Sequence, residues 1–114
     1  MNSKVKGNGG ERELRNILTA AGISATRNVQ TFIGGAGNPD ISCRVRGYQL
    51  HVEAKRTERL NLPAAMRQAE RDASNTTALP VVCHRSNKQP WLITLHLDDF
   101  LRIAKDDTGK DVKE

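Results

Sequence analysis

Apolar residues at helical spacing mark the first structured segment of the chain. Four of them recur at intervals of three and four residues: Leu14, Ile17, Leu18 and Ala21. Side chains at these intervals share one face of a helix, so the pattern predicts a helix with one buried face. We expect this helix to start near Gly10 and to stop at Gly22, because glycine is common just past a helix end.

Alternating apolar and polar residues predict a β-hairpin further along the chain. The alternation runs over residues 41–45 and again over residues 49–55, which is typical of strands with one buried face. Gly47 supplies a short turn, so we expect these two half-buried strands to pair. Another strand is predicted before them, over residues 24–32, and a glycine-rich loop follows it at residues 34–37.

A second helix is predicted after this hairpin. Asn61 is a favourable N-cap residue, and Pro63 is favourable in the first helical turn. The apolar side chains that would face inward are Leu62, Met66, Ala69 and Ala73. The other face would carry Arg67, Gln68 and Arg71.

The last part of the chain predicts two strands and a closing helix. Residues 79–83 and 91–95 are apolar runs too short for helices. Asp98 is a favourable N-cap for the helix, whose inward side chains we expect to be Phe100, Leu101 and Ala104. The predicted order, α-β-β-β-α-β-β-α, indicates a mixed sheet with helices packed on it, of α/β or α+β class.

Length and composition restrict the kind of protein. The chain has 114 residues, 12.6 kDa and a mean hydropathy of −0.59, so we expect one domain over residues 1–105 and a charged tail over residues 106–114. Neither a membrane span nor a secretory signal is apparent, which favours a cytoplasmic protein. Cys43 and Cys83 lie in apolar runs and form no CxxC pair, so we expect reduced, structural thiols.

The distribution of charge indicates a polyanionic partner. Residues 1–97 contain fourteen basic and seven acidic residues, whereas residues 98–114 contain four basic and six acidic residues. The folded body is therefore the basic part, and a basic surface attracts nucleic acid by neutralising phosphates. A merely solvated basic surface is the alternative.

Two acids and a lysine stand out on the predicted hairpin. Asp40 is in phase with the polar residues of the first strand, and Glu53 and Lys55 are in phase with those of the second. If the strands pair, the two carboxylates meet, and they repel unless a proton or cation lies between them. Oxygen ligands favour Mg²⁺ or Mn²⁺, and a neighbouring lysine can orient an attacking water. The pattern predicts a metal site.

An ordered set of motifs resembles a known family. The set comprises Gly10-Glu11-Arg12-Glu13-Leu14, then Pro39-Asp40, and then Glu53-Ala54-Lys55. Together these motifs resemble the PD-(D/E)XK nuclease superfamily, and the first is most similar to that of archaeal-type Holliday junction resolvases. The resemblance implies a restriction-endonuclease-like core and a metal-dependent DNA endonuclease, acting on branched DNA and using Mg²⁺, for which Mn²⁺ can substitute.

The resemblance also implies roles for individual residues. The implied metal ligands are Glu11, Asp40, Glu53 and the backbone carbonyl of Ala54. The implied catalytic residues are the same three acids with Lys55 and, at a looser spacing, Gln68. Periodicity does not separate Glu11 from Glu13, so only the motif selects the former. The candidate DNA-binding residues are Lys4, Lys6, Arg12, Arg15, Arg44, Arg56, Arg59, Arg67 and Arg71.

Further expectations concern partners. A resolvase makes two symmetric cuts, which implies a homodimer, although the acidic closing helix departs from the family pattern. The glycine-rich loop lacks the GK[ST] ending of a phosphate-binding loop, so we expect no nucleotide cofactor. DNA is the expected partner, and a bacterial, archaeal or phage origin fits the resemblance. The alternatives are a small phage or mobile-element nuclease that nicks duplex or flap DNA, and a catalytically inactive nucleic-acid-binding module.

Several of these residues also have an ordinary structural interpretation. Asp40 can start a turn, Glu53 and Lys55 can lie on a solvated strand face, and Glu11 can be a first-turn acid favoured by the helix dipole. His51 could approach a scissile phosphate or pack at the sheet edge. The two remaining aromatic candidates could stack on bases or fill core positions: Tyr48 and Trp91.

Overall fold

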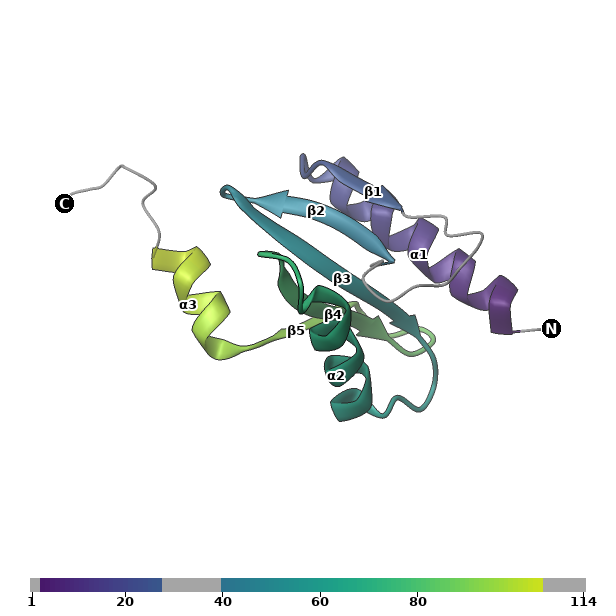
Figure 1. Ribbon diagram of the computed structural model, residues 1–114. Helices are drawn as coiled ribbons and strands as arrows, with labels where there is room; N and C mark the ends of the chain where they lie inside the picture. Colours follow the sequence, from purple (N-terminus) through teal and green to yellow (C-terminus); the bar gives the residue numbers. More distant parts are fainter. Residues whose placement is uncertain (1–2, 28–39, 106–114) are drawn as a thin grey trace.

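A computed structural model of the chain describes residues 3–27 and 40–105, with side chains from residue 9 onward. Figure 1 shows its elements, which are α1 (Ser3–Ala20), β1 (Ala25–Arg27), β2 (Ile41–Val45), β3 (Tyr48–Arg56), α2 (Leu62–Ala73), β4 (Leu79–Arg85), β5 (Leu92–Leu95) and α3 (Leu97–Lys105). Their order is the predicted one. The end of the first predicted strand, the glycine-rich loop and the charged tail lie outside the described residues.

The five strands form one mixed sheet in the order β1-β2-β3-β4-β5. The β1–β2, β2–β3 and β4–β5 pairs are antiparallel, whereas β3 and β4 run parallel. A parallel pair needs a crossover connection, which α2 provides. In the predicted hairpin, Ser42 pairs with His51 and Ile41 pairs with Val52, so the polar faces of β2 and β3 coincide. This topology confirms the α+β class.

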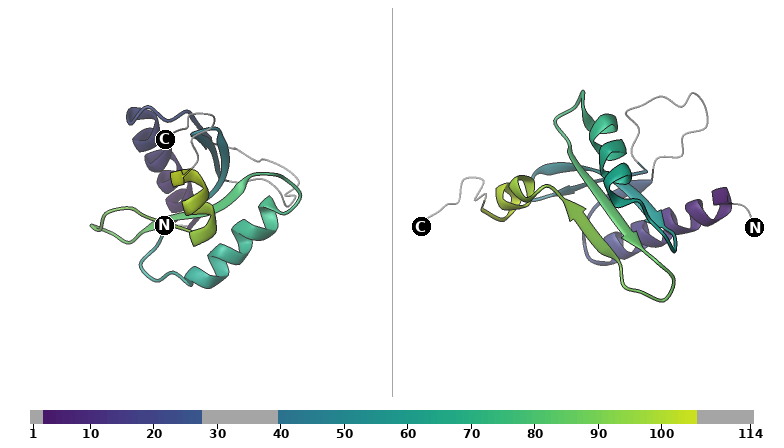
Figure 2. Two further views of the ribbon diagram at one scale, coloured as in Figure 1. Left: turned by 90° about the vertical axis from the view of Figure 1, so that its left-hand side faces the viewer. Right: turned by 90° about the horizontal axis from the view of Figure 1, so that it is seen from below.

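Helices α1 and α2 cover opposite faces of the sheet (Figure 2). The α1 face contains the larger core, formed by Leu14, Ile41, Cys43, Leu50, Val52, Leu79, Val81 and Cys83. The α2 face contains a smaller core, formed by Ala65, Ala69 and Val82. Both cysteine thiols are free and buried, as expected for structural residues.

Strand β3 is buried on both faces, which differs from the expected half-buried pattern. Leu50 and Val52 lie in the α1-side core, and His51 and Glu53 on the opposite face are equally inaccessible. The cause is the crossover helix, because α2 packs over the polar face of this central strand. His51 therefore lies in the middle of the sheet, and the expectation of an edge position is wrong.

Helix α1 is longer at its N-terminus than the apolar stripe predicts. It begins at Ser3 rather than near Gly10, which lies inside the helix. A Cβ at Gly10 would come within 3.1 Å of the Arg56 Cβ, so the glycine permits close packing of α1 on β3. In the predicted stripe, Leu14 is buried, whereas Ile17 is 47% exposed.

The start of α2 agrees with the sequence pattern, but one of its side chains does not. The backbone N–H of Ala64 donates to Asn61 Oδ1 at 3.0 Å, which confirms the N-cap. Gln68 was expected on the outer face and instead is half-buried, because its amide oxygen accepts a hydrogen bond from Lys55 on β3.

Helix α3 starts two residues earlier than an N-cap at Asp98 predicts. The backbone N–H groups of Asp99 and Phe100 each donate to the His96 carbonyl at 3.0 Å. Helical bonding therefore begins at Leu97, and Asp98 lies in the first turn instead of capping it. His96 is itself fixed by a 2.7 Å contact between its Nε2 and Glu70 Oε2 on α2.

The buried face of α3 is also different from the expected one. Phe100 and Leu101 were expected to point inward and are 51% and 41% exposed. Ala104 is exposed as well. The inward positions belong to Asp99, which is buried, and to Ile103, which packs against the larger core. Figure 1 shows α3 at one end of the molecule, away from α1, so little sheet surface is available to cover its apolar face.

Within the described residues, no helix has both the length and the apolar character needed to cross a membrane.

Candidate active site

Asp40 lies where β2 begins, directly beside the central strand. Its backbone N–H donates to the Val52 carbonyl at 3.1 Å, and its Oδ2 accepts a hydrogen bond from the Ala54 N–H at 2.9 Å. These two contacts continue the β2–β3 ladder and hold the carboxylate next to the Glu53-Ala54 peptide. The Asp40 backbone and carboxylate are therefore both held by β3. The alternative interpretation, in which Asp40 only starts a turn, does not describe these contacts.

Glu53 is the most deeply buried carboxyl group of the described residues, with 1% of its surface exposed. Burial raises its pKa from 4.5 to about 9, with further contributions from the Asp40 charge and from a hydrogen bond and charge of Asp72, while Lys55 opposes the shift. A carboxyl group in this environment is neutral near pH 7 unless a cation stabilises its charge. Glu53 is not on a solvated strand face.

Glu11 joins the same electrostatic group from α1. Burial and the nearby Asp40 charge raise its pKa, whereas Arg27 and Lys55 lower it. The guanidinium of Arg27 lies 3.6 Å from the Glu11 carboxylate. Glu11 on α1 and Glu53 on β3 thus each interact electrostatically with Asp40 at the start of β2.

Glu13 belongs to a different cluster, although it is only two residues from Glu11. Arg85 Nη2 donates to both Glu13 carboxylate oxygens at 3.0 Å, and Trp91 Nε1 donates at 3.3 Å. Arg56 lies 3.6 Å away. Although burial acts in the other direction, these partners lower the pKa of Glu13. Its charge is fully compensated, so the geometry favours Glu11 as the acid that faces Asp40.

Lys55 provides the positive charge of the group. Its Nζ donates to Gln68 Oε1 at 3.4 Å, which connects β3 to α2. Its charge also acts on both Glu11 and Glu53. The arrangement can therefore bind a hard divalent cation through oxygen ligands and hold an ammonium group beside it.

The chain is similar to known nucleases in both sequence and fold. A model of the family described as "Phage putative PDDEXK endonuclease" matches residues 2–113 of the chain. The chain belongs to this family of phage PD-(D/E)XK endonucleases. No curated protein matches the sequence.

The fold of this endonuclease is similar to that of a solved Holliday junction resolvase, Hjc from the archaeal hyperthermophile Archaeoglobus fulgidus. The TM-score is 0.64 at 24% sequence identity, and the alignment covers 78% of the present chain and 76% of Hjc. This likeness shows a shared, restriction-endonuclease-like fold. With the family match, it confirms the resemblance to the PD-(D/E)XK nucleases.

Two residues that interact with the acids of the endonuclease, Arg27 and Asp72, were not among the predicted site residues. Arg27 pairs with Ile41 across β1 and β2 and so lies next to Asp40, but its strand is too short to show a periodic pattern. Asp72 lies one helical turn after Gln68 on α2. The four-residue spacing was a usable signal, because it places both side chains on the face of α2 that meets β3.

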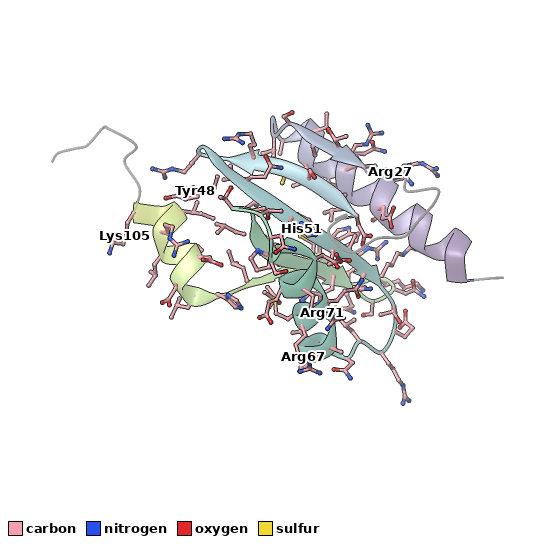
Figure 3. All side chains as sticks on the ribbon, in the orientation of Figure 1. Arg27, Tyr48, His51, Arg67, Arg71 and Lys105 are labelled. Atoms are coloured by element: carbon pink, nitrogen blue, oxygen red, sulfur yellow. The ribbon has the colours of Figure 1, made fainter. Side chains whose placement is uncertain are left out.

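The candidate DNA-binding residues of the endonuclease have different environments. Arg56 is held by Glu13, and Arg44 donates to Gln49 and to the Gly47 carbonyl in the hairpin turn. Arg15 is half-buried. The exposed candidates are Arg12, Arg44, Arg59, Arg67 and Arg71, of which Figure 3 labels the last two on α2. The side chains of Lys4 and Lys6 lie outside the described residues.

The two aromatic candidates pack against the core. Trp91 lies under Arg85, whose guanidinium carbon is 5.7 Å from the ring centroid, and it donates to Glu13. Tyr48 packs against the larger core. A hollow of about 280 Å³ near the β4–β5 turn is lined by His84, Arg85 and neighbouring residues, and it contains none of the converging acids. The acids therefore lie outside this hollow.

Proposed function

We propose that this endonuclease hydrolyses phosphodiester bonds in branched DNA with one or two Mg²⁺ ions, which Mn²⁺ can replace. The ligands would be the Glu11, Asp40 and Glu53 carboxylates and the Ala54 carbonyl oxygen. The observation that carries the proposal is the convergence of three carboxylates from α1, β2 and β3, two of which have a raised pKa partly because of Asp40. An all-oxygen, anionic donor set of this kind fits a hard divalent cation.

Each residue around the acids would have a separate role in the reaction. A divalent ion held by the acids supplies Lewis acidity toward the scissile phosphate. Lys55, which Gln68 holds in place, would orient the attacking water and stabilise the negative charge that develops on the phosphate. Arg27, 3.6 Å from Glu11, would keep that carboxylate aimed at Asp40. In-line attack by water breaks the backbone without a covalent enzyme intermediate.

The exposed arginines would bind the DNA backbone. Arg67 and Arg71 project from α2, which also carries Gln68, and Arg12 is on α1 beside Glu11. Contacts to phosphate give affinity and orientation without reading base sequence. We therefore propose that the protein acts on DNA in the cytoplasm and recognises its shape.

A branched substrate and a homodimer are supported by separate observations. Hjc, which has a similar fold, is a Holliday junction resolvase. On the present chain, three exposed apolar side chains share one face of α3 at the i, i+3 and i+4 positions, and we term them the α3 patch: Leu97, Phe100 and Leu101. Strand β5 is also an edge of the sheet. A self-complementary contact through this patch would give the two-fold symmetry that paired cuts require.

The test is cleavage of a labelled four-way junction, a flap and a matched linear duplex, each in Mg²⁺, in Mn²⁺ and in EDTA. The variants are Asp40→Asn and, as a control acid outside the group, Glu58→Gln, whose exposed carboxylate contacts the Asn87 N–H. We expect paired, metal-dependent cuts in the junction, lost in Asp40→Asn and retained in Glu58→Gln.

The other outcomes support other functions. Metal-dependent nicks in flap or duplex DNA but not in the junction would replace the resolvase by a small phage or mobile-element nuclease, which the phage family favours. Binding of all three substrates without any cleavage in either metal would show a nucleic-acid-binding module and contradict the catalytic proposal.

A further inference from the structure

A second group of potential metal ligands lies between β3 and α2. It consists of His51 and Glu53 on β3 and Asp72 on α2, whose potential ligand atoms all lie within 4.8 Å of one another. His51 is 3% exposed, and Figure 3 shows it near the middle of the sheet. Neither His51 nor Asp72 belongs to the donor set proposed for catalysis.

Two atoms of this group lack hydrogen-bond partners in the described part of the chain. They are His51 Nε2 and Glu53 Oε2, both inaccessible to solvent, and they lie 4.0 Å apart. Buried polar atoms are nearly always paired, and leaving one unpaired costs about 1–3 kcal/mol. Because 4.0 Å is too long for a hydrogen bond, the two atoms point toward a common space without satisfying each other.

A metal ion would satisfy both atoms. Ligand atoms around a tetrahedral ion with bonds of about 2.0–2.2 Å are separated by roughly 3.3–3.5 Å, so a small inward movement from the observed spacing suffices. One imidazole with two carboxylates is a mixed nitrogen and oxygen set, which suits Zn²⁺ or Co²⁺ better than Mg²⁺. The donor chemistry therefore differs from that of the all-oxygen group around Asp40.

We propose that His51, Glu53 and Asp72 form a second metal site, which takes a divalent transition-metal ion of the Zn²⁺ type. Glu53 belongs to both sites, because its Oε2 lies 4.0 Å from His51 Nε2 and its charge interacts with that of Asp40. An ion there joins α2 to β3 and fixes the orientation of the Glu53 carboxylate. The proposal does not depend on nuclease activity, because binding can be measured directly on the full chain.

The test is titration of the full-length protein with Co²⁺, followed by visible absorption, and with Zn²⁺, followed by calorimetry. The variants are His51→Gln and Asp72→Asn. The controls are His84→Gln, whose half-buried ring contacts Thr94 at 2.9 Å outside this group, and Asp40→Asn, which removes a ligand of the other donor set and none of this one. We expect Zn²⁺ affinity to fall about tenfold or more in the first two variants and to persist in both controls.

Two results would overturn the proposal. One is unchanged Co²⁺ absorption and Zn²⁺ affinity in His51→Gln, and the other is loss of all binding in Asp40→Asn alone. Because a buried substitution can prevent folding, a second measurement uses the wild-type chain. In its imidazole NMR spectrum, Zn²⁺ should shift the His51 resonances and leave those of His84 in place. An unmoved His51 signal at saturating Zn²⁺ excludes the site without any variant.

Discussion

At the scale of single residues, Glu53 has the least favourable environment in the described structure. Its carboxyl group is enclosed by β3 and α2, beside two other acids and only one lysine. A site of this kind reduces the stability of the protein without a cation, because the charged form is poorly solvated. The same feature would favour the proposed metal binding, since a cation would supply the compensating charge that the protein lacks.

Glu53→Gln should therefore stabilise the metal-free protein while abolishing cleavage. The folded-state pKa of about 9 lies above the ordinary value, so the folded protein binds the extra proton between about pH 4.5 and pH 9, and wild-type stability falls as pH rises through that window. At pH 8 in EDTA we expect the variant to be more stable by about 1 kcal/mol or more, a rise in Tm of about 4–8 °C. Near pH 4.5 the two should be equal. Thermal melts across this range check the prediction, and parallel wild-type and variant curves would contradict it.

Lys55 and Gln68 should have graded effects on the cleavage rate. Lys55→Ala removes the ammonium group beside the acids and should lower kcat about 100-fold or more. Gln68→Ala removes only the partner that holds Lys55, so its effect should be smaller. KM for DNA should change little in either variant. Single-turnover kinetics separates the two steps, and a loss confined to KM would make Lys55 a DNA-binding residue instead.

At the scale of elements, α1 carries two acids with different roles, which lie two residues apart and therefore on different sides of the helix. Glu11 faces Asp40, whereas Glu13 faces Arg56, Arg85 and Trp91. The motif alone could select Glu11, but apolar periodicity could not, since both acids lie beside the buried stripe. The partners that separate them come from β3, β4 and the β4–β5 turn, which no local pattern connects to α1.

Matched substitutions on α1 should separate these roles. Glu13→Gln leaves Arg85 with a neutral partner and should lower the free energy of unfolding by about 1–3 kcal/mol, with wild-type metal affinity in the folded protein. Glu11→Gln should weaken Mg²⁺ binding and cleavage with little loss of stability. Urea denaturation and Mg²⁺ titration of both variants measure the two effects. The division fails if Glu13→Gln abolishes Mg²⁺ binding under conditions where it is folded.

The sequence predicted where the helices and strands lie better than it predicted which of their faces are buried. Alternation located β2 and β3 and put Asp40, Glu53 and Lys55 on one face, because side-chain parity is a local property. It could not show that α2 covers this face, since that burial comes from residues far along the chain. Gln68 was placed outward for the same reason, and Asp72 was overlooked. In α3, the pattern identified an apolar face, but that face is left exposed because the helix lies beyond the end of the sheet.

At the scale of the whole molecule, the candidate active site and the exposed apolar side chains lie at different places. The acids lie where α1, β2 and β3 meet, whereas the α3 patch belongs to the helix that Figure 1 shows at one end of the molecule. Apolar side chains gathered in this way are unusual on a surface that faces only water. A second copy of the chain would cover them.

Phe100→Glu should therefore shift the protein toward monomer. A charge placed in an apolar contact is unfavourable unless it finds a partner, so we expect at least a tenfold weaker dimer by light scattering coupled to size exclusion. Ile17→Glu is a matched control, since Ile17 is similarly exposed but lies on α1. Paired junction cuts should decline in Phe100→Glu and not in Ile17→Glu. A wild-type monomer in the presence of DNA would remove the dimer and leave the nuclease chemistry intact.

The contact between Glu13 and Arg85 also bears on when the enzyme becomes active during its synthesis. The two residues are 72 positions apart, and the helix that Glu13 anchors also carries Glu11. While the chain is being translated, α1 emerges first, but its packing on β3 and the contact of Glu13 with Arg85 form only after β3 and β4 have left the ribosome. A chain that ends before β4 therefore contains all three acids but lacks the Arg85 partner that anchors α1 beside them.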